Sequence, residues 1–270
     1  MVKVPIYNLD GSKAGNVELP EVFSTPFRPD VIHRAYIALS SHKLQPQGRD
    51  FMAGKKTSAS TYNPPTGRGI SRVPRVKGER NPRSGQAAGI ASVVKGRQAH
   101  PPRSEKIMRK EINKKERLLA TASSIASSAN RELIVLRGHK IDKVPSIPLV
   151  VSDDLQSIKK AKDLGSLFGR LGLDEDVNRA SGKRKTLSGK PRMRGRTKRV
   201  AKGPLIVISE DKGVGRASMN LPGIDCVLAR DLSVLHLAPG SQPGRLVVWS
   251  KSALNSLSKP LMEVVGRLAS

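Results

Sequence analysis

The sequence predicts a three-layer α/β domain with a mostly parallel β-sheet, plus a long basic extended arm inserted between the first two helices. Two observations predict this class. Short apolar runs alternate with stretches of helical period, which is typical of parallel strands covered by helices on both faces. Residues 43–106, in contrast, keep no regular period and contain 8 Gly and 7 Pro, so they interrupt the domain.

The first elements are a strand and a helix. Residues 2–9 alternate and end at Asp10-Gly11, which predicts a strand followed by a turn. Asp30 is a suitable N-cap for a helix that continues to about residue 41. After the inserted residues, Ser104 is the predicted cap of a second helix that continues to about residue 128. The arm therefore leaves and re-enters the domain between two helices.

Beyond residue 128, short apolar runs alternate with helical stretches. The predicted strands are 133–136, 149–151, 205–208, 226–228 and 246–249, and the predicted helices are 153–171, 213–219, 231–236 and 250–258. Continuous apolar strands are typical of a sheet that is buried on both faces. We therefore expect one discontinuous globular domain formed by residues 1–42 and 107–258. Residues 259–270 are a C-terminal tail to which we assign no role.

Positive charge is concentrated in two segments. The chain carries 49 Lys and Arg against 22 Asp and Glu, a formal net charge of +27. Residues 43–106 hold 14 basic and 3 acidic side chains, and residues 179–202 hold 11 basic and no acidic ones. These two segments carry 22 of the 27 net charges (11 from each), so the remaining chain is nearly balanced. Such a charge indicates a polyanionic partner, for which nucleic acid is the first candidate.

Each basic segment has two interpretations. Residues 43–106 are predicted to be an arm that becomes ordered against a polyanion, and a solvated flexible linker is the alternative. Residues 179–202 are predicted to be a basic loop within the domain, and a nuclear localisation signal is compatible with it. Both segments together contain only two aromatic residues, Phe51 and Tyr62. Because stacking on single-stranded bases needs aromatic platforms, recognition is expected to depend on phosphate contacts and shape.

Little in the sequence indicates catalysis. Asp153-Asp154 follows a predicted strand and is expected to cap the next helix rather than to form an acid–base or metal pair. Gly213-Val214-Gly215 follows another strand, but the third glycine position of a dinucleotide-binding loop is Ser218. No ribose-binding acid has the expected spacing either. We therefore predict no enzyme activity and no cofactor.

Metal, redox and membrane functions also lack a signal. The five histidines have no metal-ligand spacing, and His100 and His139 are expected in loops or at RNA contacts. The single cysteine, Cys226, excludes a disulfide framework and is expected to be buried and inert. No run of eighteen apolar residues exists that could cross a membrane. We predict no metal and no membrane partner.

Several long motifs match those of a known family. The motifs are Phe27-Arg28-Pro29-Asp30-Val31-Ile32-His33-Arg34-Ala35, Gly67-Arg68-Gly69 leading to Arg72-Val73-Pro74-Arg75-Val76, Gly96-Arg97-Gln98-Ala99-His100-Pro101-Pro102, Ile112-Asn113-Lys114-Lys115-Glu116-Arg117-Leu118-Leu119-Ala120, Met193-Arg194-Gly195-Arg196, Asn220-Leu221-Pro222-Gly223 and Leu237-Ala238-Pro239-Gly240. On these motifs the chain, from residue 1 to about 258, resembles the universal large-subunit ribosomal protein family four in its archaeal and eukaryotic branch.

The resemblance implies a structural constituent of the large ribosomal subunit in the cytoplasm. It implies an α/β domain on the solvent side and an arm that passes through rRNA to a narrow part of the peptide exit tunnel. Residues 43–106 would be that arm, with its tip near 66–80. The implied partners are large-subunit rRNA, neighbouring large-subunit proteins and, at the tip, the nascent peptide. No homo-oligomer is expected.

Candidate site residues are mostly basic side chains of the arm, the second helix and the loop. The candidates for rRNA binding are Arg49, Lys55, Lys56, Arg83, Lys95, Arg97, His100, Arg103, Lys114, Lys115, Arg117, Arg192, Arg194, Arg196, Lys198 and Arg199. The candidates for the tunnel tip are Arg68, Arg72, Arg75 and Lys77, which could instead bind rRNA like the rest of the arm. The alternative function is an architectural DNA-binding protein with basic arms. A nucleotide-dependent enzyme is retained only because the fold permits it.

Overall fold

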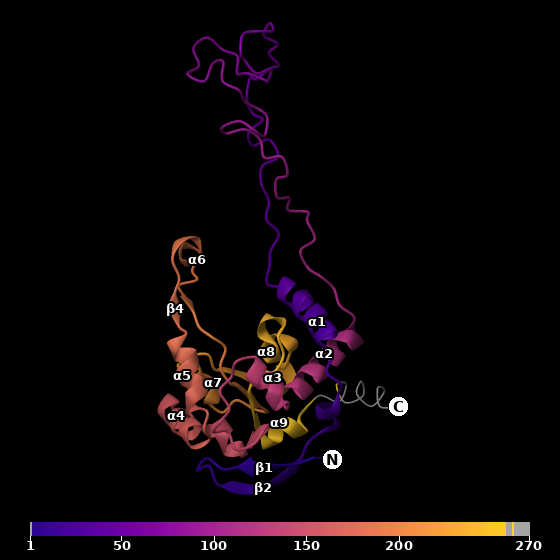
Figure 1. Cartoon of the computed structure of the whole chain (residues 1–270), viewed down its shortest axis with the longest axis vertical. Helices are drawn as coiled ribbons and strands as arrows, with labels where there is room; N and C mark the ends of the chain where they lie inside the picture. The colour runs from indigo at the N-terminus through magenta and orange to yellow at the C-terminus, as the bar shows by residue number, and fades with distance from the viewer. Residues whose placement is uncertain (1, 258–260, 262–270) are drawn as a thin grey trace. The chain divides into compact units, whose positions relative to one another are not determined.

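The computed structural model describes residues 2–257 and residue 261 (Figure 1). The predicted C-terminal tail, 259–270, lies outside the described residues apart from Leu261. The chain divides into two compact units. We call the chain before Ser41 and after Arg109 the body, and Ser41–Arg109 the inserted segment.

The body is built on a six-stranded sheet with the order β2-β1-β3-β8-β6-β7. Its strands are β1 (Lys3–Tyr7), β2 (Lys13–Glu18), β3 (Leu149–Val151), β6 (Leu205–Ile208), β7 (Asp225–Leu228) and β8 (Val247–Ser250). Neighbouring strands are parallel except β1 and β2, which form an antiparallel hairpin. The predicted α/β class with a mostly parallel sheet is confirmed.

Helices connect the strands and flank the sheet. The α-helices are α1 (Pro29–Ser41), α2 (Lys114–Ser127), α3 (Arg131–Leu136), α4 (Ala161–Arg170), α5 (Asp174–Gly182), α6 (Gly189–Met193), α7 (Val214–Ser218), α8 (Val234–Leu237) and α9 (Lys251–Asn255). Short 3-10 helices are η1 (Glu21–Ser24), η2 (Asp153–Ser157), η3 (Ala229–Asp231) and η4 (Pro239–Ser241). A separate two-stranded hairpin pairs β4 (Lys185–Thr186) with β5 (Lys198–Arg199).

Alternate residues of the central strands pack into two separate cores. In β6, Ile206 and Ile208 pack with α3, α4 and α7 on one face of the sheet. Leu205 and Val207 pack with α2, α8 and α9 on the other. This alternation follows from the strand period of two, and it places a helical layer on each face. The described body therefore has three layers.

The ends of the inserted segment leave the body from a packed pair of helices. Ile32 and Ala35 of α1 form a small core with Ala120 of α2 and with α8. Ser123 of α2 fixes the chain that enters α1, since its hydroxyl accepts a hydrogen bond from the Arg28 amide at 2.8 Å. The same hydroxyl donates to the Pro26 carbonyl at 2.9 Å.

The predicted strand at 133–136 is wrong, because these residues form α3. The Asn130 side chain accepts a hydrogen bond from the Glu132 amide at 2.9 Å and caps the helix. Only Ile134 of the four apolar residues is buried, whereas Val135 and Leu136 are exposed. Four apolar residues are too few for their period to distinguish a helix from a strand.

Three predicted helices also differ from the observed ones. The helix predicted from Ser104 begins only at Lys114, and Ile107 in the missing part is 88% exposed. Residues without a core to pack against do not sustain a short helical turn in water. The helix predicted at 153–171 divides into η2 and α4, because Ile158 adopts an extended conformation between them. The helix predicted at 250–258 is α9, which ends at Asn255.

Candidate nucleic-acid interface

The inserted segment has no helix and no strand longer than a single bridge within the described residues. Its main ordered feature is a meeting of three stretches at Arg75, which bridges Ser60 on one side and Ala87 on the other. The Arg75 amide donates to the Ser60 carbonyl at 2.9 Å, and the Ala88 amide donates to the Pro74 carbonyl at 3.0 Å. We call residues 58–60, 71–77 and 84–88 the tip cluster.

The Arg75 side chain holds the tip cluster together. Its guanidinium donates to the Gly85 carbonyl at 2.9 Å and to the Ser71 carbonyl at 3.2 Å. Val76 and Ala88 are buried beside it, although they belong to none of the three cores of the body. Arg75 is therefore committed to the backbone of its own segment, unlike the exposed Arg68, Arg72 and Lys77.

The other candidates in the inserted segment are exposed, except Arg83 and Arg97, which are half-buried. Lys56 pairs with Asp50 at 2.8 Å, and its ammonium holds the pKa of that carboxyl below its usual value. Arg49 donates to the Gln98 side chain at 2.6 Å. This bond links the two limbs of the segment, by which we mean its outgoing and its returning half. Among the described residues, Lys55, Lys95, Arg97 and Arg103 form no ion pair.

The limbs of the inserted segment come into close backbone contact at Gly54 and Gly96. A Cβ atom on Gly54 would lie 2.4 Å from the carbonyl carbon of Gly96. Gly54 also has a φ of +82°, in the left-handed region that favours glycine. This crossing leaves no room for a side chain and brings Lys55 and Arg97 to neighbouring positions along the two limbs.

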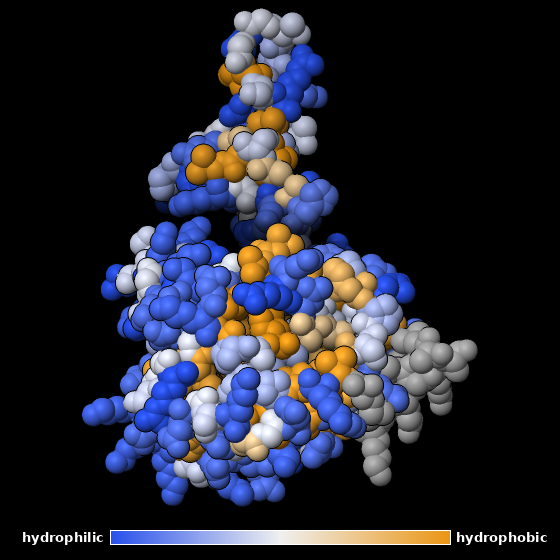
Figure 2. All heavy atoms as spheres, turned by 60° about the horizontal axis from the view of Figure 1, so that its bottom comes forward, coloured by the Kyte–Doolittle hydropathy of each residue, from blue (hydrophilic) through white to orange (hydrophobic). Residues whose placement is uncertain are grey.

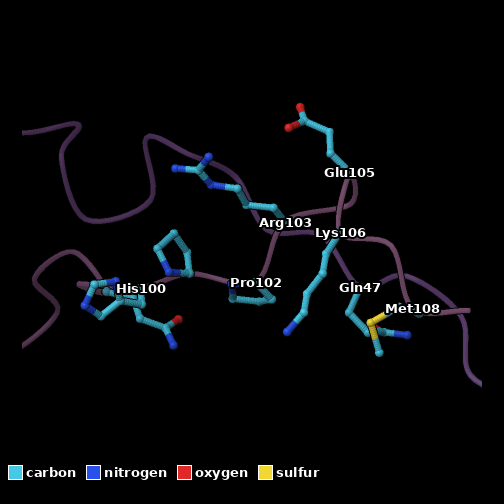
Figure 3. A pocket seen from close by; sticks show the side chains of 9 residues that line it. Gln47, His100, Pro102, Arg103, Glu105, Lys106 and Met108 are labelled. Carbon is cyan, nitrogen blue, oxygen red and sulfur yellow. The ribbon is translucent and has the colours of Figure 1, made fainter. Parts of the chain in front are cut away.

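A pocket of about 820 Å³ lies in the same segment, between Gln47 and residues 98–108. Figure 3 shows that the labelled side chains project in different directions and do not converge on one point. Its charged residues, Arg103, Glu105 and Lys106, are exposed. The pocket therefore lacks the convergent groups that a catalytic site requires.

The candidates Lys114, Lys115 and Arg117 occupy the first turn of α2 and are exposed. The remaining candidates, Arg192, Arg194, Arg196, Lys198 and Arg199, lie on α6, β5 and the turn between them, all exposed. The predicted basic loop is thus an ordered hairpin, and it projects from the body in Figure 1. We call residues 183–202 the basic hairpin. None of these candidates forms an ion pair with another described residue.

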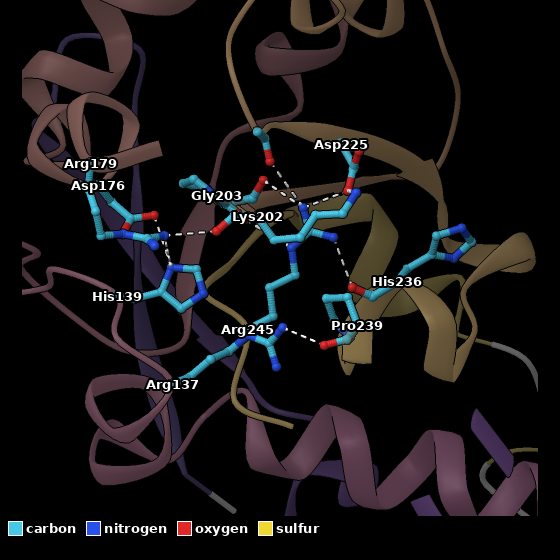
Figure 4. A network of polar contacts seen from close by, with 12 residues as sticks. Arg137, His139, Asp176, Arg179, Lys202, Gly203, Asp225, His236, Pro239 and Arg245 are labelled. Carbon is cyan, nitrogen blue, oxygen red and sulfur yellow. Dashed lines mark hydrogen bonds and ion pairs between the residues drawn. The ribbon is translucent and has the colours of Figure 1, made fainter. Parts of the chain in front are cut away.

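A network of charged side chains, several of them buried, begins at Lys202, where the basic hairpin ends (Figure 4). Arg245 is fully buried and pairs with Asp225 at 2.7 Å. Its guanidinium also donates to the carbonyls of Gly203 and His236, each at 2.9 Å. Burial lowers the pKa of Arg245, although Asp225 acts to raise it. Lys202 pairs with the same Asp225 carboxylate at 2.8 Å, which joins the hairpin to the network.

His139 lies in a loop, as expected, but it is buried in this network and is not an exposed contact. Its Nδ1 atom lies 2.9 Å from an oxygen of the buried Asp176. Because that carboxylate only accepts hydrogen bonds, Nδ1 carries the proton and donates. Burial lowers the pKa of His139 below its usual value despite the Asp176 charge. Burial would raise the pKa of Asp176, but hydrogen bonds from His139 and Arg179 outweigh it and hold that pKa low.

Arg137 borders the network without a carboxylate partner. Its guanidinium donates to the carbonyls of Pro239, at 2.7 Å, and Gln242. Burial and the nearby charges of Arg245 and Arg179 lower the pKa of Arg137 to about 10. Arg137 also lines a pocket of about 510 Å³. We call this the cationic pocket; the basic side chains that line it are Arg137, Arg179, Lys183, Lys185, Arg199 and Lys202.

Of these lining residues, the sequence prediction named only Arg199 as a binding candidate. The remaining five come from the end of α3, from α5 and from the two ends of the basic hairpin. Four of them, Arg179, Lys183, Lys185 and Lys202, lie within the basic segment 179–202, and that run of charge is the signal that could have found them. No pattern of spacing joins Arg137 to this segment.

The position corresponding to a nucleotide-binding loop is occupied by the chain itself. The Asp211 carboxylate accepts hydrogen bonds from the Gly213 and Gly215 amides, at 2.9 and 3.1 Å. An anion bound there would have to displace this carboxylate. At the same edge of the sheet, Gln156 bonds to Ser252 at 2.6 Å and fills the space between β3, β6 and β8.

The remaining chemical candidates also have structural partners. Asp153 does not cap its own helix; its carboxylate accepts from the Ser252 amide at 2.8 Å, at the start of α9. Cys226 is half-buried, and burial raises the pKa of its thiol to about 12. Among the described residues, no group of three His, Cys, Asp or Glu side chains could hold a metal ion. No described helix is long and apolar enough to cross a membrane.

Comparison with known proteins shows similarity to one family over nearly the whole chain. A sequence model of the ribosomal protein L4/L1 family matches residues 17–260. The protein named large ribosomal subunit protein uL4 in Methanococcus aeolicus is 47% identical over 96% of this chain and 99% of its own length. Proteins of the same name in Methanosphaera stadtmanae and Methanopyrus kandleri are 42% and 43% identical, over 95% and 97% of this chain and 96% and 100% of their own lengths.

Proposed function

Because the chain belongs to the ribosomal protein L4/L1 family, we propose that its inserted segment and its basic hairpin bind large-subunit rRNA. The chain is a structural constituent of the large ribosomal subunit in the cytoplasm and is not an enzyme. We further propose that neighbouring large-subunit proteins pack against its body. Figure 2 shows hydrophilic side chains over most of the visible face of the body, with smaller apolar patches between them.

One observation carries the proposal of rRNA binding: exposed cations gather on two segments that offer almost no carboxylates to neutralise them. Unpaired cations of this density repel one another until a polyanion neutralises them. Phosphates are the matching groups, since Arg and Lys bind them without reading base sequence. The scarcity of aromatic residues in both segments favours phosphate contacts over base stacking.

The salt dependence of binding tests this proposal. If roughly ten side chains neutralise phosphates, the slope of log affinity against log salt should lie at about −7 to −9. The measurement uses the full chain and a large-subunit rRNA transcript from an archaeon, over a series of KCl concentrations. A slope shallower than about −3 would overturn the proposal.

Competition with DNA distinguishes rRNA binding from the architectural DNA-binding alternative. We expect the rRNA transcript to displace the chain from duplex DNA of equal phosphate concentration, because the arm and the hairpin would fit a folded RNA. Equal competition by the two nucleic acids would favour the alternative. In cells, sedimentation of the chain with the large subunit is the corresponding expectation.

We propose a division of work within the inserted segment: its limbs anchor to rRNA, and Arg68, Arg72 and Lys77, in or beside the tip cluster, meet the nascent peptide in the exit tunnel. An extended limb of about 30 residues could span at most roughly 100 Å, which is ample for a site deep in a particle. The glycines at 67, 69 and 78 and Ser71 place small side chains at the tip, which suits a passage for varied peptides, although Ile70 between them is 43% exposed.

The tip is tested with two variants that the structure separates. Arg68→Ala with Arg72→Ala removes exposed charges, whereas Arg75→Ala removes the bonds that hold the tip cluster. The double variant should assemble into subunits almost normally but change elongation through stalling-prone peptides. Arg75→Ala should impair assembly as well. If the double variant fails to assemble while stalling in the surviving particles is unchanged, the tip is an rRNA anchor.

A further inference from the structure

The cationic pocket is a built cavity and not a row of surface lysines. Its base is formed by Arg137 and Arg179, which are half-buried and fixed by hydrogen bonds. Arg179 bonds to Asp176 at 2.8 Å and to the Lys202 carbonyl at 2.8 Å. Its rim carries the exposed side chains of Lys183 and Lys185. Anchored guanidinium groups lose little side-chain entropy when they bind an oxyanion.

The charges around the pocket do not balance. The network holds two carboxylates, Asp176 and Asp225, and both are already paired with Arg179, Arg245 and Lys202. No carboxylate is among the residues that line the pocket. Arg137 uses its two observed bonds on neutral carbonyls, which leaves three of its five N–H groups. The pocket therefore offers guanidinium and ammonium donors to an oxyanion, with no carboxylate in its lining to compete for them.

We propose that the cationic pocket binds a backbone phosphate of RNA, held by Arg137 at its base and by the lysines of the basic hairpin at its rim. The inference rests on the proposed rRNA binding and adds a specific contact on the body. The pocket volume is about 510 Å³, whereas one water molecule occupies roughly 30 Å³ in the liquid. The pocket is therefore large enough for a phosphodiester together with several water molecules. No Phe, Tyr or Trp lines the pocket, and the imidazole of His139, which does line it, is only 1% exposed. A nucleobase therefore finds no exposed ring on which to stack, which favours the RNA backbone over a free nucleotide.

The test compares full-length variants on the archaeal large-subunit rRNA transcript. The double variant Lys183→Gln with Lys185→Gln removes two exposed charges from the rim of the pocket. The variant Arg137→Gln removes one of the two guanidinium groups at its bottom. The matched control, Lys162→Gln with Lys251→Gln, removes two exposed lysines from α4 and α9. Each pocket variant should weaken binding about tenfold at 0.15 M salt, since hydrogen bonds to charged groups contribute this much. The salt slope should become shallower by about 0.7 to 0.9 for each phosphate that the variant no longer neutralises. The control should stay within about twofold.

Ethylation interference supplies a direct measurement. Phosphates whose ethylation blocks binding are mapped for the wild-type chain, and one or two of them should lose their effect in both pocket variants. An unchanged set of phosphates, with affinities equal to that of the control, would overturn the pocket while leaving rRNA binding intact. A shallow salt slope in the wild type would instead overturn the proposed function. If Arg137→Gln fails to fold by circular dichroism, the exposed lysine pair decides the question.

Discussion

The fully buried Arg245 allows a quantitative prediction about the body. We expect Arg245→Met to destabilise the body, because a side chain of similar length would then carry no charge and no donor. The change removes the donor of the hydrogen bonds that the carbonyls of Gly203 and His236 accept from Arg245 at 2.9 Å. It also removes the 2.7 Å ion pair with Asp225.

The magnitude follows from what each partner retains. Breaking a buried ion pair from one side costs about 3–5 kcal/mol. The lower end applies here because Asp225 is 35% exposed and keeps Lys202 at 2.8 Å. We therefore expect a loss of about 3 kcal/mol in the free energy of unfolding. For a unit of about 200 residues this corresponds to a fall in Tm of roughly 6–12 °C.

Urea unfolding of the RNA-free chain, followed by circular dichroism, measures this loss. The matched control is Arg230→Met, which alters an exposed arginine of the same body and should change stability by less than about 0.5 kcal/mol. Combining Arg245→Met with Asp225→Asn should cost less than the sum of the two single changes, because the pair is removed together. A loss below about 1 kcal/mol for Arg245→Met would refute the reasoning.

Three other perturbations have expected outcomes. Deleting residues 46–100 should leave the Tm of the body within about 2 °C of its value in the full chain, because none of the described core residues of the body lies in that range. A much larger shift in scanning calorimetry would contradict this expectation. His139 should make the free energy of unfolding fall in acid, because burial lowers its pKa in the folded chain and the unfolded chain therefore binds the proton first. Stability should be lost as the pH falls below about 6.5, with a slope of at most about 1.4 kcal/mol per pH unit. His139→Gln should flatten that part of the urea-derived pH profile, and an unchanged profile would argue against it. Gly54→Ala should weaken rRNA binding more than tenfold in a filter assay, whereas Gly89→Ala, which has a similar positive φ but open space around its Cβ position, should stay within about threefold; equal effects would mean that only backbone strain matters.

The resemblance to a family could be recognised from the sequence, and so could much of the fold. The apolar runs at 149–151 and 205–208 are strands β3 and β6, because continuous apolar residues of this length are stable mainly inside a sheet covered on both faces. The run at 133–136 has the same composition but is a helix, since Asn130 caps it and the body offers no strand beside it. Local composition could not separate these two cases.

The sequence alone predicts the segregation of charge and the alternation of strand and helix, because both are properties of neighbouring residues. It indicated the exposed cations of the basic hairpin for the same reason. The packing of distant segments alone shows that Arg75 holds a backbone cluster and that Arg137 and Arg179 meet the hairpin at one pocket. A buried charge is stable only where distant segments supply its partners, and those partners are chosen by packing and not by spacing along the chain.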